Sequence, residues 1–216
     1  MIEVSHLVHR YGAVEALRLE SLRLEAGESC LLLGPSGCGK STLLHVLAGL
    51  LRPAEGRVVV AGADLAALPG AALDRHRGTH IGIVPQKLHL VSSLTLFQNL
   101  ALAQSMAGLP VDARRIGEVL ESVGLADRAQ SRPRMLSQGQ AQRAAMARAV
   151  VNRPKVLLAD EPTSSLDDGN AAAALDLLES QAHANGATLV IATHDARAAA
   201  RIPRQVRLPV DAGGSA

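Results

Sequence analysis

The chain has 216 residues, which suits one compact domain, and 48 % of them are apolar, enough to build a core. Aromatic residues are only 1 % of the chain, so this core has to be built from Leu, Val, Ile and Ala. The net charge of +2 gives no reason to expect a nucleic-acid ligand, and the two cysteines lack zinc-binding spacing, which favours reduced cytosolic thiols.

The sequence shows no feature of a membrane-spanning or secreted protein. No apolar run approaches the ~18 residues that a membrane-spanning helix needs. The first residues, MIEVSHLVHRYG, lack the basic region and apolar stretch of a signal peptide. We therefore expect a cytoplasmic protein that reaches a membrane only through a partner.

Short strands are predicted in the first part of the chain. Partial period-2 alternation and glycine boundaries mark most of them, and the run CLLL is apolar enough for a buried strand. The apolar segment that follows CLLL, STLLHVLAGLL, predicts a helix at 41–51. The strands are expected at 2–9, 16–25, 30–33, 56–62 and 80–86.

Helices dominate the middle of the chain and alternate with strands afterwards. Helical periodicity runs over 94–124, with a break at 108–110, and a further helix is expected at 135–150. Apolar strands that alternate with helices predict an α/β fold with a mostly parallel sheet covered on both faces. The later elements are a strand at 155–160, a helix at 169–186, a strand at 187–193, a short helix and a strand at 205–210.

The segment GPSGCGKST at 34–42 matches the phosphate-binding pattern G-x-x-x-x-G-K-[ST] between a strand and a helix. Glycines let successive N–H groups point inward, and the helix N-terminus adds partial positive charge. We predict that Lys40 reaches the β- and γ-phosphates of a nucleotide and that the Ser41 hydroxyl is a ligand of Mg²⁺. The candidate phosphate-binding residues are Gly34, Pro35, Ser36, Gly37, Cys38, Gly39, Lys40, Ser41 and Thr42.

Two carboxylates, Asp160 and Glu161, end the apolar strand in VLLADEP. Ligands of open α/β sheets bind at the carboxyl ends of the strands. We predict that Asp160 holds Mg²⁺ and that Glu161 orients and polarises the water that attacks the γ-phosphate. The alternative is a simple strand-end turn, and the phosphate loop in the same chain favours the functional interpretation.

Gln86 and His194 also end apolar strands, and a lone Gln or His at such a position is usually structural or solvated. A functional role is favoured for both residues, because they are expected at the same edge of the same sheet as the phosphate loop. Gln86 is then a candidate ligand of Mg²⁺ or of the attacking water, and His194 a candidate donor to the γ-phosphate. The other histidines, His9 among them, have no such context and are assigned no role.

These motifs occur together and in this order in one family. The chain resembles the nucleotide-binding subunit of ATP-binding cassette (ABC) transporters over nearly its whole length. GPSGCGKST resembles the Walker A motif, VLLADEP the Walker B motif, Gln86 the Q-loop and His194 the switch histidine. Tyr11, the only tyrosine, lies where the family places the aromatic residue that stacks on adenine, although an ordinary surface or core tyrosine is the alternative.

The resemblance implies the domain organisation. It predicts a P-loop NTPase with a mostly parallel sheet, an N-terminal antiparallel β part and an inserted helical subdomain. The whole chain, 1–216, would be one ABC ATPase domain. About 1–87 and 153–216 would form its nucleotide-binding core, and 88–152 the helical subdomain.

The segment LSQGQ at 136–140 is similar to the family signature LSGGQ. In the family, two cassettes meet head to tail, and each signature closes over the ATP that the other holds. The resemblance therefore implies that Ser137, Gly139 and Gln140 contact a nucleotide bound by a second cassette. Ser137 also suits an ordinary helix N-cap, which needs the same geometry. Gln138 departs from the family, because it replaces the first of the paired glycines.

The segment SSLD at 164–167 is similar to the D-loop of the family, which assigns Asp167 to the nucleotide site. Ser165 stands where the family often has Ala. LADEPTSSLD and the chain length also resemble cassettes of the lipoprotein-release and macrolide-export type. That group often has Gly-Asn where this chain has Ser164 and Ser165.

The resemblance implies an ATPase that powers export or lipid and lipoprotein extrusion, with ATP and Mg²⁺ as cofactors. A second cassette, as a homodimer, and transmembrane permease subunits are the implied partners, and no nucleic acid is expected. The protein would be cytoplasmic and peripheral on the inner face of the cell membrane, with 87–106 facing the permease.

Other functions remain possible for the same motifs. An importer cassette, or a regulatory cassette that acts on envelope enzymes, would use the same residues. Cassettes that act on nucleic acid or on ribosomes are disfavoured. The segment between the phosphate loop and the signature has no sustained heptads of a coiled coil, and the sequence carries one set of cassette motifs instead of two. A GTPase is disfavoured, because the guanine motif N-K-x-D is missing.

Overall fold

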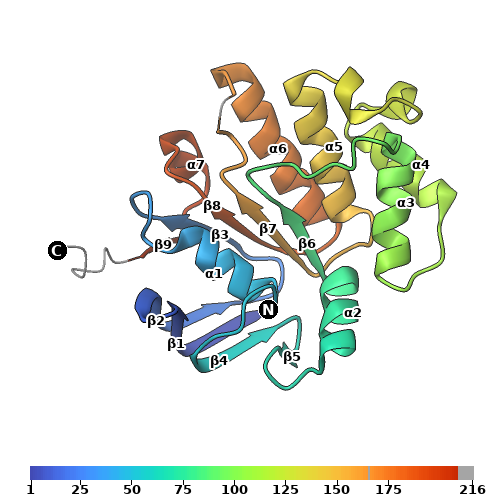
Figure 1. Ribbon diagram of the computed structural model, residues 1–216. Coiled ribbons are helices and arrows are strands. Elements are labelled where there is room, and N and C mark those ends of the chain that lie inside the picture. The colour runs from blue at the N-terminus through green and yellow to red at the C-terminus, as the bar shows by residue number, and fades with distance from the viewer. Residues whose placement is uncertain (165, 209–216) are drawn as a thin grey trace.

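The computed structural model describes residues 1–164 and 166–208 and arranges them around two sheets (Figure 1). The first sheet is antiparallel, with the strand order β2-β1-β4-β5. It confirms the predicted N-terminal antiparallel β part. Its strands are β1 (Ile2–Tyr11), β2 (Val14–Leu24), β4 (Glu55–Val60) and β5 (Ala63–Asp64).

The second sheet is parallel, with the order β6-β7-β8-β3-β9. This order brings the carboxyl ends of β3, β6, β7 and β8 to one edge, as the sequence predicted. The last strand ends before its expected limit of 210, and residues 209 and 210 lie outside the described part. The strands are β3 (Ser29–Leu33), β6 (Ile81–Val84), β7 (Val156–Asp160), β8 (Thr188–Ala192) and β9 (Gln205–Arg207).

Neighbouring residues along these central strands point to opposite faces of the parallel sheet, and both faces are covered. Leu31 and Leu157 pack with helices from the range 96–184 on one face. Leu32 and Leu158 pack on the other face, with the helix at 40–47 and the antiparallel sheet. The central strands are therefore apolar except at their ends, because they have no solvated side.

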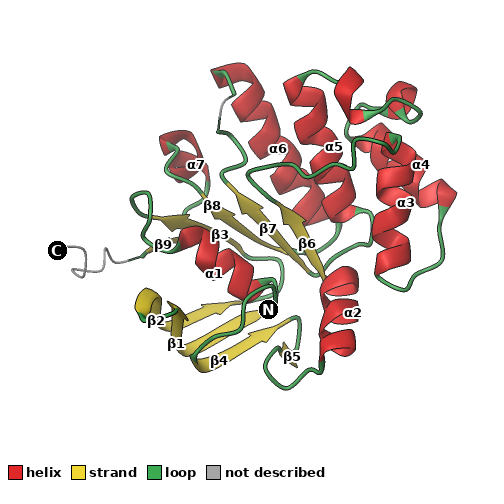
Figure 2. Cartoon of the chain, in the orientation of Figure 1, coloured by secondary structure: helices red, strands yellow, loops and turns green. Residues whose placement is uncertain are grey.

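Figure 2 shows α1 between the two sheets and α3 to α6 gathered beyond the other face of the parallel sheet. Two short 3₁₀ turns, Ala126–Arg128 and Pro133–Met135, precede α5. The helices are α1 (Lys40–Leu47), α2 (Gly70–His80), α3 (Leu96–Met106), α4 (Ala113–Ser122), α5 (Gln138–Val150), α6 (Asp168–Ala184) and α7 (Ala196–Arg201).

The sequence placed the helices well, with two exceptions. The helix expected from residue 135 begins at Gln138, because Ser137 is its N-cap and the preceding 3₁₀ turn ends at Met135. Helix α2 was not predicted, because Leu73 is its only buried residue and it therefore carries no apolar stripe.

The described chain between β6 and β7 contains α3, α4 and α5, which matches the expected helical block. Leu100 of α3 and Met146 of α5 belong to the same core cluster as Leu157 of β7. The block thus shares a core with the sheet, and its division at 88–152 stays a prediction. Among the described helices, none has the length and apolar character needed to cross a membrane.

Candidate functional site

The phosphate loop leaves β3 and enters α1 through two glycines with positive φ that tolerate no side chain. At Gly39, the N-cap of α1, φ is +91° and a Cβ would lie 2.7 Å from the Ala16 carbonyl oxygen. At Gly34, φ is +155° and a Cβ would lie 2.4 Å from Cys38 Sγ. The glycines therefore let the loop fold tightly over the N-terminus of α1, where backbone N–H groups attract anions.

Lys40 is the first residue of α1 and is only 7 % exposed. Its Nζ donates to the carbonyl oxygens of Gly34 at 2.7 Å and Pro35 at 2.9 Å. The ammonium group is thus held inside the curve of the loop. A buried cation beside a helix N-terminus favours a phosphate ligand.

Asp160 ends β7 next to this loop, and its Oδ1 is buried without a hydrogen-bond partner among the described residues. Burial raises the pKa of Asp160, and the Ser41 hydroxyl acts in the opposite direction. A carboxylate oxygen left without a donor, beside a hydroxyl, fits a hard cation such as Mg²⁺. Among the described residues, no group of three or more Cys, His, Asp or Glu side chains could hold a metal ion.

Glu161 follows Asp160 in the left-handed region, with φ of +46°. Its N–H donates to the Ala192 carbonyl oxygen at 2.8 Å, which ties the residue to the end of β8. Its Oε2 accepts a hydrogen bond from Thr193 Oγ1 at 2.8 Å, and its Oε1 lies 2.9 Å from His194 Nδ1. The carboxylate is therefore held in one orientation by two residues that follow the neighbouring strand.

A cavity of about 420 Å³ is lined by Lys40 and Glu161, whereas Asp160 is not among its lining residues. Its walls come from the phosphate loop, from the ends of β1, β6, β7 and β8, and from the start of β2. The parallel sheet thus brings Gln86, Glu161 and His194 together as predicted, and the antiparallel sheet supplies Tyr11. The lining residues are Tyr11, Ala16, Ser36, Gly37, Gly39, Lys40, Ser41, Thr42, Gln86, Glu161 and His194.

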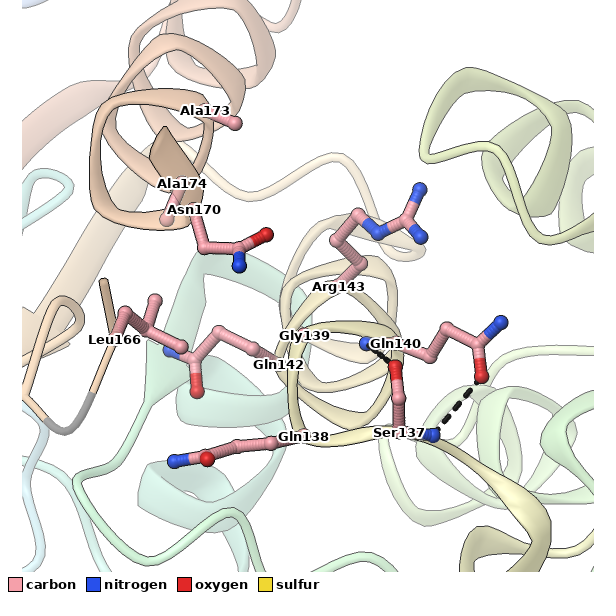
Figure 3. Close-up of a pocket in the computed structure, with 10 residues that line it drawn as sticks. All are labelled: Ser137, Gln138, Gly139, Gln140, Gln142, Arg143, Leu166, Asn170, Ala173 and Ala174. Carbon is pink, nitrogen blue, oxygen red and sulfur yellow. Dashed lines mark hydrogen bonds between the residues drawn. The ribbon is translucent and has the colours of Figure 1, made fainter. Parts of the chain in front are cut away.

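The signature segment lies elsewhere, in a second cavity of about 530 Å³ between the N-terminal parts of α5 and α6. Ser137 Oγ accepts from Gln140 N at 3.3 Å, and Gln140 Oε1 accepts from Ser137 N at 2.9 Å. This capping box orients both side chains at the helix start, and Figure 3 shows Gln138 pointing away from them. A Cβ on Gly139 would meet only Asn170 Oδ1, at 3.6 Å, so the cavity is open beside its backbone.

Asp167 does not line either cavity. It is the N-cap of α6, where its side chain accepts hydrogen bonds from Asn170 N at 2.9 Å and Asn170 Nδ2 at 2.6 Å. These bonds lower the pKa of Asp167. Its neighbour Ser165, which the sequence also singled out, lies outside the described residues.

Three residues that hold the loops of the first cavity were not predicted from the sequence. Thr193 fixes Glu161, as described above. Gln142 of α5 donates to the Pro162 carbonyl oxygen at 3.0 Å, one residue beyond Glu161. Arg148 of α5 donates to the carbonyl oxygens of His89 at 2.6 Å and Leu88 at 2.9 Å, in the segment that follows Gln86. Arg148 could have been noticed in the sequence, because it is the only charged residue between Ala144 and Val151, in an otherwise apolar and buried stretch.

Comparisons with known proteins agree with this geometry. The family model described as ABC transporter matches residues 17–164. The lipoprotein-releasing system ATP-binding protein LolD of Roseobacter denitrificans is 41 % identical over 215 residues, which cover 98 % of this chain and 93 % of that protein. The macrolide export ATP-binding/permease protein MacB of Rhodopseudomonas palustris is 41 % identical over 91 % of this chain, which spans only 30 % of the MacB sequence.

Solved structures show the same architecture. A dimeric structure of a bacterial ABC transporter cassette superposes with a TM-score of 0.88 and 32 % identity, covering 96 % of this chain and 94 % of that one. The post-hydrolysis structure of that cassette, bound to ADP and Pi, has a TM-score of 0.86 over the same fractions. The chain therefore belongs to the ABC transporter family, as an ATP-binding cassette with ATPase activity.

Proposed function

We propose that this chain energises a membrane transporter by closing a dimer of cassettes around ATP and reopening it on hydrolysis. The separation of the two cavities is the observation that carries this proposal. One cavity holds a lysine, a glutamate, a glutamine and a histidine around a phosphate loop. The other is lined by the N-terminal residues of α5 together with residues of α6, and none of its lining residues is a carboxylate. The first cavity therefore holds the acid–base groups, and the second offers a helix N-terminus without them.

The first cavity supplies the groups that hydrolysis needs. Lys40 would neutralise charge on the β- and γ-phosphates, and Glu161 would orient and polarise the attacking water. His194 would donate to the γ-phosphate, and Gln86 would hold the attacking water. The hydrogen bonds that Glu161 makes to Thr193 and His194 support this assignment, because a positioned carboxylate is what an in-line attack requires.

Ser41, Asp160 and Gln86 are the proposed ligands of Mg²⁺. The partnerless, buried Oδ1 of Asp160 supports this set. When bound, the ion would neutralise charge that develops on the phosphate oxygens. The loop residues Gly34 to Thr42 would bind the phosphates through their backbone N–H groups, and Tyr11 would stack on the adenine.

The second cavity is proposed to act on a nucleotide bound by another cassette. Ser137, the Gly139 N–H and Gln140 would contact its γ-phosphate, and Asp167 would lie at the interface. The capping box already presents this helix start to the cavity. The dimeric arrangement of the related cassette supports a homodimer of this chain.

The relatives favour export or lipoprotein release. LolD is described as part of a lipoprotein-releasing system and MacB as a macrolide exporter. Permease subunits would then hold the chain at the inner face of the cell membrane. Import is the alternative, because the methionine import ATP-binding protein MetN of Geobacillus kaustophilus is 44 % identical over 85 % of this chain. That match covers 54 % of MetN.

A capture experiment tests the proposal. Tagged Glu161→Gln protein, loaded with ATP and Mg²⁺, would be incubated with detergent-solubilised membranes of the host, and its bound proteins identified. The matched control is Glu121→Gln, the same change on the exposed face of α4. A multi-span permease enriched only by Glu161→Gln is the expected result, and its cargo class would separate export from import. Recovery of a ribosomal, DNA-bound or envelope-enzyme complex instead would refute transport and leave the ATPase assignment intact.

A further inference from the structure

His9, which sequence analysis set aside, is buried beside the first cavity. It is 7 % exposed, and its Nδ1 lies 2.9 Å from the Arg52 carbonyl oxygen. Because a carbonyl only accepts, Nδ1 carries the proton in this contact. The other ring nitrogen, Nε2, is buried and has no hydrogen-bond partner among the described residues. A histidine with one unsatisfied nitrogen is costly to bury, so its position calls for an explanation other than core packing.

The ring of His9 meets the ring of Tyr11. Their centroids lie 4.8 Å apart at an interplanar angle of 82°, the edge-to-face geometry that aromatic pairs prefer. Residues two apart in a strand point to the same face, and β1 carries both, with a register shift just after His9. Tyr11 is nevertheless 52 % exposed, and it lines the first cavity together with residues of the phosphate loop.

We propose that His9 is a positioning residue that holds the Tyr11 ring edge to face and so presents its free face to the adenine of a bound nucleotide. The inference rests on the proposed function of Tyr11. The chain anchors His9 twice, through the Arg52 carbonyl and through burial, whereas Tyr11 lies at the last position of β1, just before a turn. Without an ordered neighbour, an exposed ring at a strand end would lose rotational freedom when it stacks on adenine, and this loss would cost binding free energy. An ordered neighbour such as His9 reduces that cost.

The composition of the chain makes the proposal measurable. Tyr11 is the only tyrosine, and the sequence has no tryptophan, so all tyrosine emission reports on this ring. Two substitutions separate the features of His9. His9→Phe keeps a ring beside Tyr11 without a donor to the Arg52 carbonyl, and His9→Asn keeps a donor without a ring. Tyr11→Leu removes the stacking partner.

Each variant would be examined by the anisotropy of tyrosine emission without nucleotide, where a tyrosine is present, and by its dissociation constants for ADP and pyrophosphate. ADP carries the adenine, and pyrophosphate engages the phosphate loop alone. We expect His9→Asn to lower the anisotropy and to weaken ADP binding by about two- to tenfold. It should leave pyrophosphate binding unchanged, and His9→Phe should restore both the anisotropy and the affinity for ADP.

The inference would be overturned if His9→Asn kept the parental affinity for ADP and the parental anisotropy while Tyr11→Leu still weakened ADP binding. Equal loss of ADP and pyrophosphate binding in His9→Asn would also overturn it, since the effect would then be a general loss of structure. Failure of His9→Phe to rescue would show that the ring contact is not what matters. Parental ADP binding by Tyr11→Leu would instead refute the adenine role of Tyr11 within the proposed function, and the inference with it.

Discussion

The two cavities of this molecule differ in the chemistry of their walls. The first gathers Lys40, Gln86, Glu161 and His194 from four separate places in the chain. The second is built by two helix starts, and Arg143 is the one ionisable residue among those that line it. Figure 3 shows the Arg143 side chain directed away from α6, and its Nη1 donates to the Val123 carbonyl oxygen at 3.0 Å. A site for chemistry needs acid–base groups held at fixed positions, whereas a site that only binds an anion needs N–H groups and positive charge.

Because their lining residues differ in acid–base chemistry, the two cavities should respond differently to substitution. Changes in the first should either remove turnover and preserve nucleotide binding, or weaken nucleotide binding itself, according to the group removed. Changes in the second should affect turnover without affecting nucleotide binding by a single chain. The two cavities are also joined within the chain, because α5 carries the signature at its start and donates to the loop after Glu161 through Gln142.

The largest expected effect is at Glu161. Replacing it with Gln keeps the shape but removes the charge that polarises water, so turnover should fall by about 10²- to 10⁴-fold while ATP binding is retained. Steady-state phosphate release and calorimetric binding of ATP measure the two quantities. Glu121→Gln serves as the control. Turnover near the parental rate in Glu161→Gln would eliminate this residue as the base.

The second cavity is tested by Ser137→Ala, with Thr95→Ala as its control. Both residues are N-caps in a capping box, so each variant should lose about 1 kcal/mol of unfolding free energy. Only Ser137→Ala should lower turnover, by roughly tenfold or more, because a hydrogen bond to a charged phosphate is lost. ATP binding at low protein concentration should stay unchanged in both. Equal turnover in the two variants would contradict the proposed role of the signature.

A smaller effect is expected from the residue that supports Glu161. Thr193→Val removes the donor to Glu161 Oε2 and keeps the size of the side chain, so turnover should fall about fivefold, with the KM for ATP unchanged. Thr188→Val is the control, since Thr188 lies at the opposite end of β8 and donates to the Glu25 carbonyl oxygen. We expect both variants to lose unfolding free energy and only Thr193→Val to lose turnover. An equal loss of turnover in the two variants would assign the effect to packing.

The smallest effect concerns stability and pH. Hydrogen bonds from Arg197, and to a lesser extent from Thr163, hold the pKa of Asp195 well below its usual range. Because the folded pKa is depressed, the stabilisation is present above the unfolded value of about 3.9 and is lost as the pH falls below it. Asp195→Asn should therefore be less stable than the parent at neutral pH, with a gap that closes as the pH falls below about 4.

Urea unfolding of both proteins across this pH range measures the gap. Asp127→Asn is a suitable control, since Asp127 is exposed and its ion pair is with its neighbour Arg128. A gap for Asp195→Asn that does not change with pH would show that the Arg197 contact contributes through packing and not through charge.

Much of the site could be predicted from local pattern. The phosphate loop follows an apolar strand and opens a helix, and that order is readable in the residues themselves. Gln86, Asp160, Glu161 and His194 each lie at the end of an apolar strand or within two residues after it, so a parallel sheet was enough to gather them at one edge. Ser137 was readable as an N-cap, because capping depends on residues three apart in the chain.

The tertiary structure alone decided which side chains support these groups. Whether Thr193 reaches Glu161, or Arg148 the segment after Gln86, depends on the packing of elements far apart in sequence. His9 and Tyr11 are close in the sequence, but the burial of His9 and its hydrogen bond to the Arg52 carbonyl depend on tertiary packing and leave no local signal. Motifs can therefore be recognised in the sequence wherever their geometry is local, whereas the partners of a supporting residue cannot, because non-local packing sets them.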